Sequence, residues 1–192
     1  MKRTVLAIAL LALSAPFTFA QTSTWKADPA HSEVDFTVRH GGVSNVHGRF
    51  TLKEATLLYN EADVTKSTVT ATIDIASVNT GETARDNHLK TDSFFDTAKF
   101  ATATFTSTSV ARDGSSLKVT GNLTLHGVTK QVVLNVEGPA TPTENPMDKK
   151  LHSGFEATTT ISRTAFAIGS SFPALLISDE VKLTIDLEIV KQ

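Results

Sequence analysis

Apolar and polar residues alternate along most of this chain, and that period of two constrains its fold more than any other feature. Successive side chains of a β-strand point to opposite faces, so alternation predicts strands with one dry face and one wet face. Residues 180–191 give the clearest case, because Val181, Leu183 and Ile185 alternate with charged or threonine residues. The sequence therefore predicts an all-β protein.

The same pattern recurs along the chain between short turn signals. Glycine-containing pairs such as Asp113-Gly114 and His126-Gly127 separate neighbouring segments and favour hairpin turns. A high threonine content agrees with this interpretation, since β-branched side chains pack well on a pleated surface. The predicted strands, eight in number, cover residues 31–40, 49–59, 67–75, 99–110, 116–125, 130–138, 155–162 and 180–191.

Two segments depart from the alternation. Residues 81–96 contain helix-forming residues, and Thr83 is expected to cap a short helix that begins near Ala84. Residues 163–179 are apolar without alternating, and Pro173 argues against a central strand there. We expect one short helix and one apolar loop. Eight short antiparallel strands form either a sandwich or a closed barrel, and periodicity alone does not decide between them.

The N-terminus predicts export. Lys2 and Arg3 precede an apolar run at residues 5–13, and a small residue ends the segment at Ala20, as in a signal peptide. The run is too short to span a bilayer, which takes about 20 apolar residues. We therefore expect a signal peptide at 1–20, a single domain at 21–192, a periplasmic location and no stable membrane anchor.

Composition excludes several kinds of chemistry. The chain contains no cysteine, which excludes disulfides, thiol nucleophiles and thiolate metal sites. Its 18 basic side chains are outnumbered by 20 acidic ones without a basic cluster, so nucleic acid is not an expected partner. His31, His40 and His47 do not converge in the predicted arrangement, and no G-x-S-x-G motif is present. We expect no metal, no other cofactor and no enzymatic activity.

Five motifs in a fixed order carry a family resemblance. They are "DPAHSEVDFTVRH" (28–40), "GRF" (48–50), "RDNHLKTDSFFD" (85–96), "GNLTLHGVTKQV" (121–132) and "ISRTAFAIG" (161–169). Together they make the mature chain resemble the YceI family of exported, lipocalin-like, polyisoprenoid-binding proteins. The resemblance implies an extended eight-stranded antiparallel barrel with an apolar lumen for a long isoprenoid chain. Dimers occur among relatives, so a homodimer is a possible assembly.

Within that barrel, apolar residues on the dry faces and in the apolar loop are expected to line the lumen or its entrance. The candidates are Val34, Phe36, Val38, Phe50, Ile73, Phe94, Phe95, Phe105, Leu123, Phe155, Phe166 and Phe172.

The head-group candidates are Arg85, His88 and Arg163. An arginine fork suits phosphate or carbonyl oxygens, and residues three apart on a helix share a face. The alternative is a solvated helix on which Arg85 pairs with Asp86, Asp92 or an acid on a strand.

These observations predict a carrier that sequesters a long-chain isoprenoid lipid, of the polyprenyl phosphate or quinone type. An alternative is a filled barrel that serves as a protein-interaction or stress-response module without a lipid ligand. A small hydrolase is a third, weaker possibility.

Overall fold

The computed structural model describes residues 22–192, so the predicted signal peptide lies outside the described residues. One short helix is present there, α1 (Thr83–Leu89), together with the single-turn 3-10 helices η1 (Pro29–His31), η2 (Val64–Lys66) and η3 (Thr164–Phe166). The strands are β1 (Thr22–Ala27), β2 (Glu33–His40), β3 (Ser44–Asn60), β4 (Thr68–Asn79), β5 (Thr102–Asp113), β6 (Ser116–Leu125), β7 (Val128–Glu137), β8 (Thr143–Glu144), β9 (Leu151–Ser162) and β10 (Ile177–Lys191).

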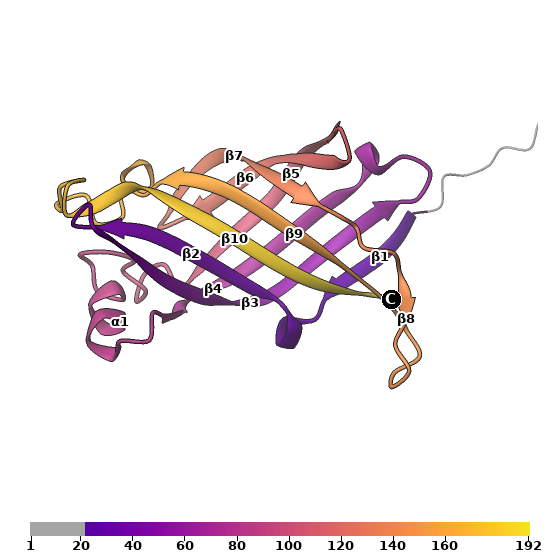
Figure 1. Ribbon diagram of the computed structural model, residues 1–192, viewed down its shortest axis with the longest axis horizontal. Helices are drawn as coiled ribbons and strands as arrows, with labels where there is room; N and C mark the ends of the chain where they lie inside the picture. Colours follow the sequence, from indigo (N-terminus) through magenta and orange to yellow (C-terminus); the bar gives the residue numbers. More distant parts are fainter. Residues whose placement is uncertain (1–21) are drawn as a thin grey trace, which may run out of the picture.

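Eight strands close into an antiparallel ring. The order is β2-β3-β4-β5-β6-β7-β9-β10, and β10 pairs with β2 to complete the circle. This confirms the predicted eight-stranded antiparallel barrel with one short helix. In Figure 1, α1 and the loop that precedes β10 lie at one end of the barrel, and β8 and the C-terminus lie at the other.

Two strands escaped prediction. The short β1 pairs with both β3 and β10 beyond the end of β2, so β1, η1 and β2 follow one another along a single track. The second missed strand, β8, contains only two residues and pairs with the start of β9. The predicted helix cap was also wrong: the Glu82 side chain, rather than Thr83, accepts from the Ala84 amide at the start of α1.

The pairing is uneven around the ring. β9 and β10 are in register over a long stretch, from Ser162 opposite Glu180 to His152 opposite Val190. β7 and β9 pair only over the three residues Asn135, Val136 and Glu137. Beyond these three pairs, the β6–β7 turn lies against η3. Within residues 22–192, one hydrogen bond joins these two segments, between His126 Nδ1 and the Phe166 carbonyl oxygen at 3.1 Å. The β7–β9 seam is therefore the least hydrogen-bonded junction of the barrel.

The dry faces of the strands point into the barrel, as the alternation predicts. On β2 the inward residues Val34 and Phe36 are 7% and 8% exposed, while their neighbours Glu33 and Asp35 face solvent or are half-buried. β6 repeats the pattern over its whole length. The apolar interior is therefore one continuous cluster that all eight strands of the ring supply.

Two phenylalanines lie over glycines on the barrel wall. A Cβ atom built on Gly48 would fall 2.3 Å from the Phe36 ring, and one built on Gly121 would fall 2.3 Å from the Phe105 ring. Gly48 is the cross-strand partner of Phe36. Because glycine has no side chain, each ring can lie against the wall instead of projecting across the lumen.

We predict that Gly48→Ala will lower the free energy of unfolding by about 1–3 kcal/mol, since the new methyl group would overlap the Phe36 ring and the Thr80 side chain and force both to shift. Urea denaturation followed by tryptophan fluorescence measures the change. The matched control is Gly48→Ala in a Phe36→Leu background, where most of the clash is removed and the cost should shrink. Equal costs in the two backgrounds would show that the ring does not depend on Gly48.

Candidate functional site

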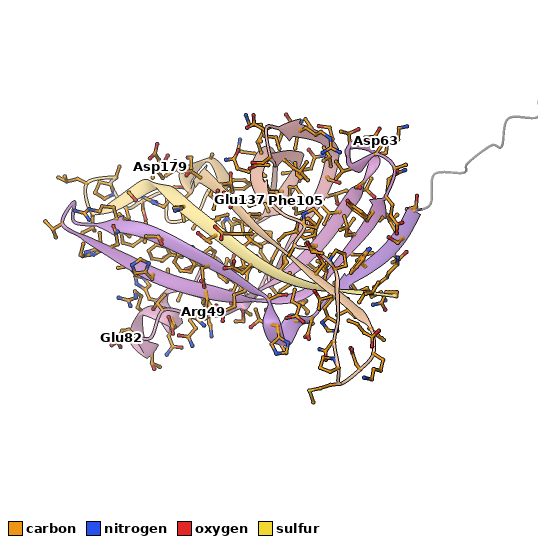
Figure 2. The ribbon with its side chains drawn as sticks, turned by 45° about the vertical axis from the view of Figure 1, so that its right-hand side comes forward. Arg49, Asp63, Glu82, Phe105, Glu137 and Asp179 are labelled. Carbon is orange, nitrogen blue, oxygen red and sulfur yellow. The ribbon has the colours of Figure 1, made fainter. Side chains whose placement is uncertain are left out.

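The barrel contains an apolar cavity in two adjoining compartments. The larger has a volume of about 160 Å³ and the smaller about 120 Å³. Val34, Ile73, Leu123 and Leu183 line both compartments and therefore form a waist between them. Phe105, labelled in Figure 2, lines the larger compartment. The smaller compartment lies toward α1, because Leu89, Phe94 and Phe95 contribute to its lining.

All but two of the predicted lumen residues line this cavity. Phe105 and Phe155 line the larger compartment, while the waist includes Val34, Ile73 and Leu123. The residues that line the smaller compartment alone are Phe36, Val38, Phe50, Phe94 and Phe95. The structure thus brings together side chains from both ends of the sequence, in the manner expected of a lumen.

Phe166 and Phe172 lie outside the lining. Phe166 belongs to η3, is 2% exposed and packs in the apolar core cluster without lining either compartment. Phe172 stacks on Phe94 with ring centroids 4.8 Å apart. Both residues come from the apolar loop, which lacks the strand pleat that made the other inward directions predictable. Both were expected to line the lumen or its entrance. Neither lines the cavity itself, while Phe172 contacts Phe94, which lines the smaller compartment.

Sequence reasoning did not single out much of the remaining lining. Leu52 on β3, Val119 on β6 and Ile185 on β10 all face the larger compartment. The alternation of these strands already indicated them, because assigning every residue of each strand to the inward or the outward face would have found them. Hydroxyl-bearing side chains also line the larger compartment: Tyr59, Ser67, Thr68 and Thr159.

Arg163 is the one charged side chain, among residues 22–192, that lines either compartment. It is 4% exposed, and its guanidinium donates to five backbone carbonyls. The acceptors are the carbonyl oxygens of Ser178 (3.1 Å), Ile168 (3.1 Å), Gly169, Phe172 (2.7 Å) and Ile177 (2.9 Å).

A guanidinium carries five N–H donors, so these bonds use its full capacity. Arg163 therefore organises the loop between β9 and β10 and has no donor left for a lipid head group. This corrects its expected role, because the sequence did not reveal that its partners are backbone carbonyls of the following loop and of the first two residues of β10.

The other two head-group candidates lie on α1, outside the cavity. Arg85 Nε donates to Thr80 Oγ1 at 2.8 Å and Nη2 donates to the Thr80 carbonyl oxygen at 3.0 Å. Neither Asp86 nor Asp92 is its partner, so that form of the alternative was wrong. His88 packs edge-on against Phe94, with ring centroids 5.0 Å apart. Both candidates lie at the end of the barrel where the smaller compartment lies.

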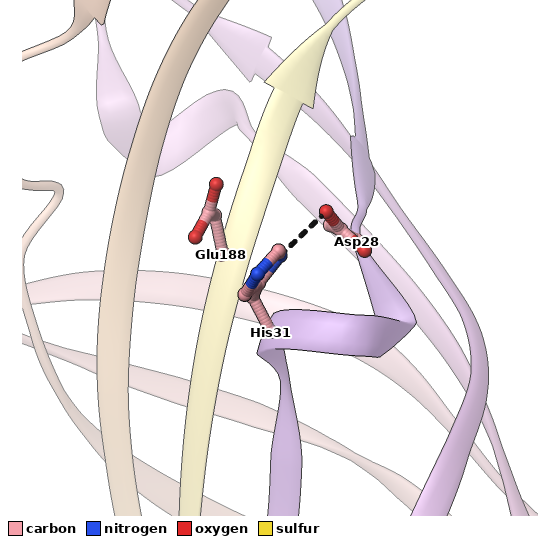
Figure 3. Close-up of side chains that lie close together, drawn as sticks. All are labelled: Asp28, His31 and Glu188. Carbon is pink, nitrogen blue, oxygen red and sulfur yellow. Dashed lines mark hydrogen bonds and ion pairs between the residues drawn. The ribbon is translucent and has the colours of Figure 1, made fainter. Parts of the chain in front are cut away.

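A separate polar groove lies on the outer surface near η1 and β8, with a volume of about 490 Å³. Asp28 Oδ2 and His31 Nδ1 are 2.9 Å apart there, and ligand atoms of Asp28, His31 and Glu188 lie within 4.8 Å of one another (Figure 3). Within residues 22–192, these three residues form the group that could hold a divalent cation. His40 and His47 take no part, since His47 Nδ1 bonds instead to Thr37 Oγ1 at 3.0 Å.

His152 links the same groove to the hairpin before β9. Its Nδ1 lies 2.6 Å from Glu188 Oε1 and its Nε2 lies 3.0 Å from Asp148 Oδ2. The hydrogen bond with Glu188, followed by that with Asp148, raises the pKa of His152. The Asp28 hydrogen bond likewise raises the pKa of His31.

The fold and cavity define a class before any comparison is made. A closed eight-stranded antiparallel barrel has room for one small ligand if its interior is not filled by side chains, as in lipocalins. Here the interior is lined by apolar side chains and contains a two-compartment cavity. The protein is therefore a small β-barrel of the lipocalin-like type with an apolar internal site.

Comparison with known proteins gives the family. A family model described as a YceI-like domain matches residues 25–189. The chain is 38% identical over 197 residues to protein YceI of Escherichia coli O6:H1, and 37% identical over 195 residues to protein YceI of Salmonella arizonae, with 100% of both chains covered in each case. The chain belongs to the YceI family, as its motifs predicted.

Solved structures agree with the fold. The crystal structure of BcnA from Burkholderia cenocepacia has a TM-score of 0.75 at 25% identity, over 84% of this chain and 98% of that one. The YceI protein of Campylobacter jejuni has a TM-score of 0.68 at 29% identity, over 100% and 99%. A polyisoprenoid-binding domain from Saccharophagus degradans, implicated in plant cell wall breakdown, has a TM-score of 0.62 at 20% identity, over 88% and 98%. Within residues 22–192, no helix has the length and hydrophobicity to cross a membrane.

We predict that Arg163→Met will destabilise the protein by about 3 kcal/mol or more, because it leaves several buried carbonyl oxygens without a donor. Urea denaturation measures the loss, and limited chymotrypsin digestion should show faster cleavage in the loop before β10. Arg163→Lys should recover little, because an ammonium group has three donors for five acceptors. The control is the exposed Arg39→Met, which should change stability by less than about 0.5 kcal/mol. Equal behaviour of the two Met variants would contradict the role given to Arg163.

The raised pKa of His152 predicts a pH-dependent contribution to stability. Because the pKa is higher in the folded protein, this contribution is fully present below the unfolded value of about 6.5 and is lost as pH rises through the folded value. His152→Gln should therefore reduce stability at pH 5.5 more than at pH 8.5. Thermal unfolding of both proteins across this range tests it, and a pH-independent difference would exclude the ionic contribution.

Proposed function

We propose that this protein is a periplasmic carrier that sequesters a long-chain isoprenoid lipid with an uncharged head group, of the quinone type, in the barrel lumen. The observation that carries the proposal is the lining of the cavity: it is apolar, and its one charged side chain within the described residues, Arg163, is already bonded to five carbonyls. Export by the N-terminal segment brings the carrier to the periplasm in this proposal. No metal, cofactor or catalytic step is required.

The driving force is the removal of apolar surface from water. Burial of apolar surface contributes roughly 25 cal/mol per Å², so an isoprenoid chain that buries several hundred Å² gains several kcal/mol before the cost of ordering it. Apolar sites with few polar groups are typical of small-molecule pockets. The polyisoprenoid-binding domain from Saccharophagus degradans, which has the same fold, supports the proposal.

The lumen favours a neutral ligand over a phosphate. An ionised group transferred from water into an apolar interior without a partner loses far more hydration energy than the interior returns. A polyprenyl phosphate would have to leave its head outside, near Arg85 and His88 on α1. A quinone ring needs only weak hydrogen bonds and can enter the cavity. This difference in hydration energy is the reason that we propose the quinone type rather than the polyprenyl phosphate type.

Cavity size limits how the chain is accommodated. An engineered cavity of about 150 Å³ holds one benzene molecule, which is close to the 160 Å³ of the larger compartment. The two compartments in their present form therefore accept only a few isoprene units. A longer chain requires side chains at the waist, or the Phe36 and Phe105 rings, to move aside.

The main alternative is a filled barrel that acts as a protein-interaction or stress-response module. Its interior would be expected to be closely packed, as protein cores are. The two-compartment cavity favours the carrier instead.

Lipid extraction tests the proposal directly. The protein, expressed with its N-terminal segment and purified from the periplasm, should release a prenyl lipid in near-stoichiometric amount on organic extraction, detected by mass spectrometry. Delipidated protein should bind a long-chain quinone more tightly than a polyprenyl phosphate of matched chain length. The proposal fails if no lipid is released and neither ligand binds.

Substitution in the larger compartment separates a lumen from a packed core. Phe105→Trp should reduce the amount of quinone bound while the protein remains folded, because the larger ring occupies cavity volume. In a packed core the same change would cost about 1–3 kcal/mol and affect no ligand. The control is Phe100→Trp, since Phe100 packs against His126 and lines neither compartment. Quinone titration and urea denaturation of both variants distinguish these outcomes.

A further inference from the structure

Exposed apolar side chains gather at the end of the barrel near the smaller compartment. Val43, in the turn between β2 and β3, is 79% exposed, and Leu175 and Leu176, in the loop before β10, are 83% and 42% exposed. We call these three residues the apolar tip. The two loops that carry them lie together at the end of the barrel where α1 lies (Figure 1). Their contact is direct, because the Gly41 amide donates to the Leu176 carbonyl oxygen at 2.8 Å.

The backbone holds these side chains in their exposed positions. The Leu176 amide donates to the Pro173 carbonyl oxygen at 2.9 Å, and the Ile177 amide donates to the same oxygen at 3.1 Å. On either side of the tip, Arg163 binds the carbonyls of Phe172 and Ile177. Leu175 and Leu176 are therefore exposed on a loop whose backbone is held by hydrogen bonds. One side of this loop faces solvent, and the other side contacts Arg163.

The chemistry of the tip differs from that of the opposite end. Residues 164–178 contain no charged side chain, and neither do residues 41–46 of the adjacent turn. At the other end of the barrel, Met147 is 92% exposed but is followed directly by Asp148, Lys149 and Lys150. Uncharged loops with several exposed aliphatic side chains suit insertion among lipids, whereas a single apolar residue beside charges does not.

The apolar tip is also continuous with the cavity. Ile177, directly after Leu176, lines the smaller compartment. Phe172, from the same loop, stacks on Phe94, which also lines that compartment. One loop therefore presents leucines to solvent on its outer side and closes the cavity with its inner side.

We propose that the apolar tip docks on the surface of a lipid bilayer and that isoprenoid lipid passes there between the membrane and the smaller compartment. The second half of this proposal rests on the function proposed above, while docking itself does not. Passage through water would expose the whole apolar chain, so a carrier that touches the membrane at its loading end avoids that cost. Basic Arg39 precedes the turn that carries Val43, and acidic Asp179 and Glu180 follow the loop that carries Leu175 and Leu176. The flanking charge is therefore not positive, and attachment depends on apolar insertion rather than on attraction to anionic lipids.

Co-flotation with vesicles tests docking. The vesicles are phosphatidylcholine and phosphatidylethanolamine without quinone, and the variants are Leu175→Asp and Val43→Asp, one in each loop. Loss of one inserted aliphatic side chain and gain of a charge should reduce the vesicle-bound fraction roughly tenfold or more. Met147→Asp, the matched control at the opposite end, should float like the parent protein, and high salt should not release either of them. Circular dichroism verifies that each variant is folded.

Quinone transfer tests the role of docking. Leu175→Asp should slow the transfer of quinone from vesicles to the protein, while its equilibrium affinity for quinone in detergent solution should equal that of the parent. Docking is overturned if the parent protein does not float, or if both tip variants float as well as the parent. It is also overturned if Met147→Asp loses binding equally, or if sedimentation shows that Leu175→Asp only dissociates a dimer. Absence of quinone binding in detergent would overturn the carrier function and leave the flotation result to decide docking.

Discussion

Closure of the sheet through β10 is the constraint on which the rest of the structure depends. β10 pairs with β2 on one side and with β9 on the other, and these two ladders convert an open sheet into a ring. Once the ring is closed, every inward side chain shares one interior, and eight strands leave either a filled core or a small cavity. The inward leucines and isoleucines of β10 contribute to both compartments, so the strand that closes the barrel also lines its site.

What keeps the interior from filling completely is the placement of small residues opposite large ones. Gly48 and Gly121 let Phe36 and Phe105 lie against the wall, which leaves space along the axis. Charged side chains are meanwhile confined to the outside and to the ends. Arg163 is the exception within the described chain, and its donors are all taken by the carbonyls of the loop that closes one end. Arg163 thus stabilises the loop, and the cavity of the described chain has no cation free to pair with a phosphate.

The sequence predicted the strands, the barrel and most of the lining, because all three follow from which side chains alternate and from the family motifs. It missed β1, whose alternation covers only a few residues, and β8, which has two residues and no pattern. It did not give the directions of the Phe166 and Phe172 side chains, since a loop has no period from which a direction can be derived. Arg163 could not be predicted for a different reason: its partners are backbone carbonyls, which every residue has and no sequence pattern marks. The groove around His31 and Glu188 joins residues from opposite ends of the described chain, and only the closed register brings them together.

The β7–β9 seam has a consequence for how the barrel could change its volume. A ring of eight strands widens most easily where the fewest backbone hydrogen bonds resist, and here that is a junction of three residue pairs. Separation at this seam would leave the long β9–β10 ladder intact as one edge of the opening and β7 as the other. The barrel is then not rigid, because its circumference can increase at the β7–β9 seam to accommodate a longer bound molecule. In hydrogen exchange, the amides of Asn135 to Glu137 would lose protection before those of β10. A bound isoprenoid chain would change the rate at which these amides exchange.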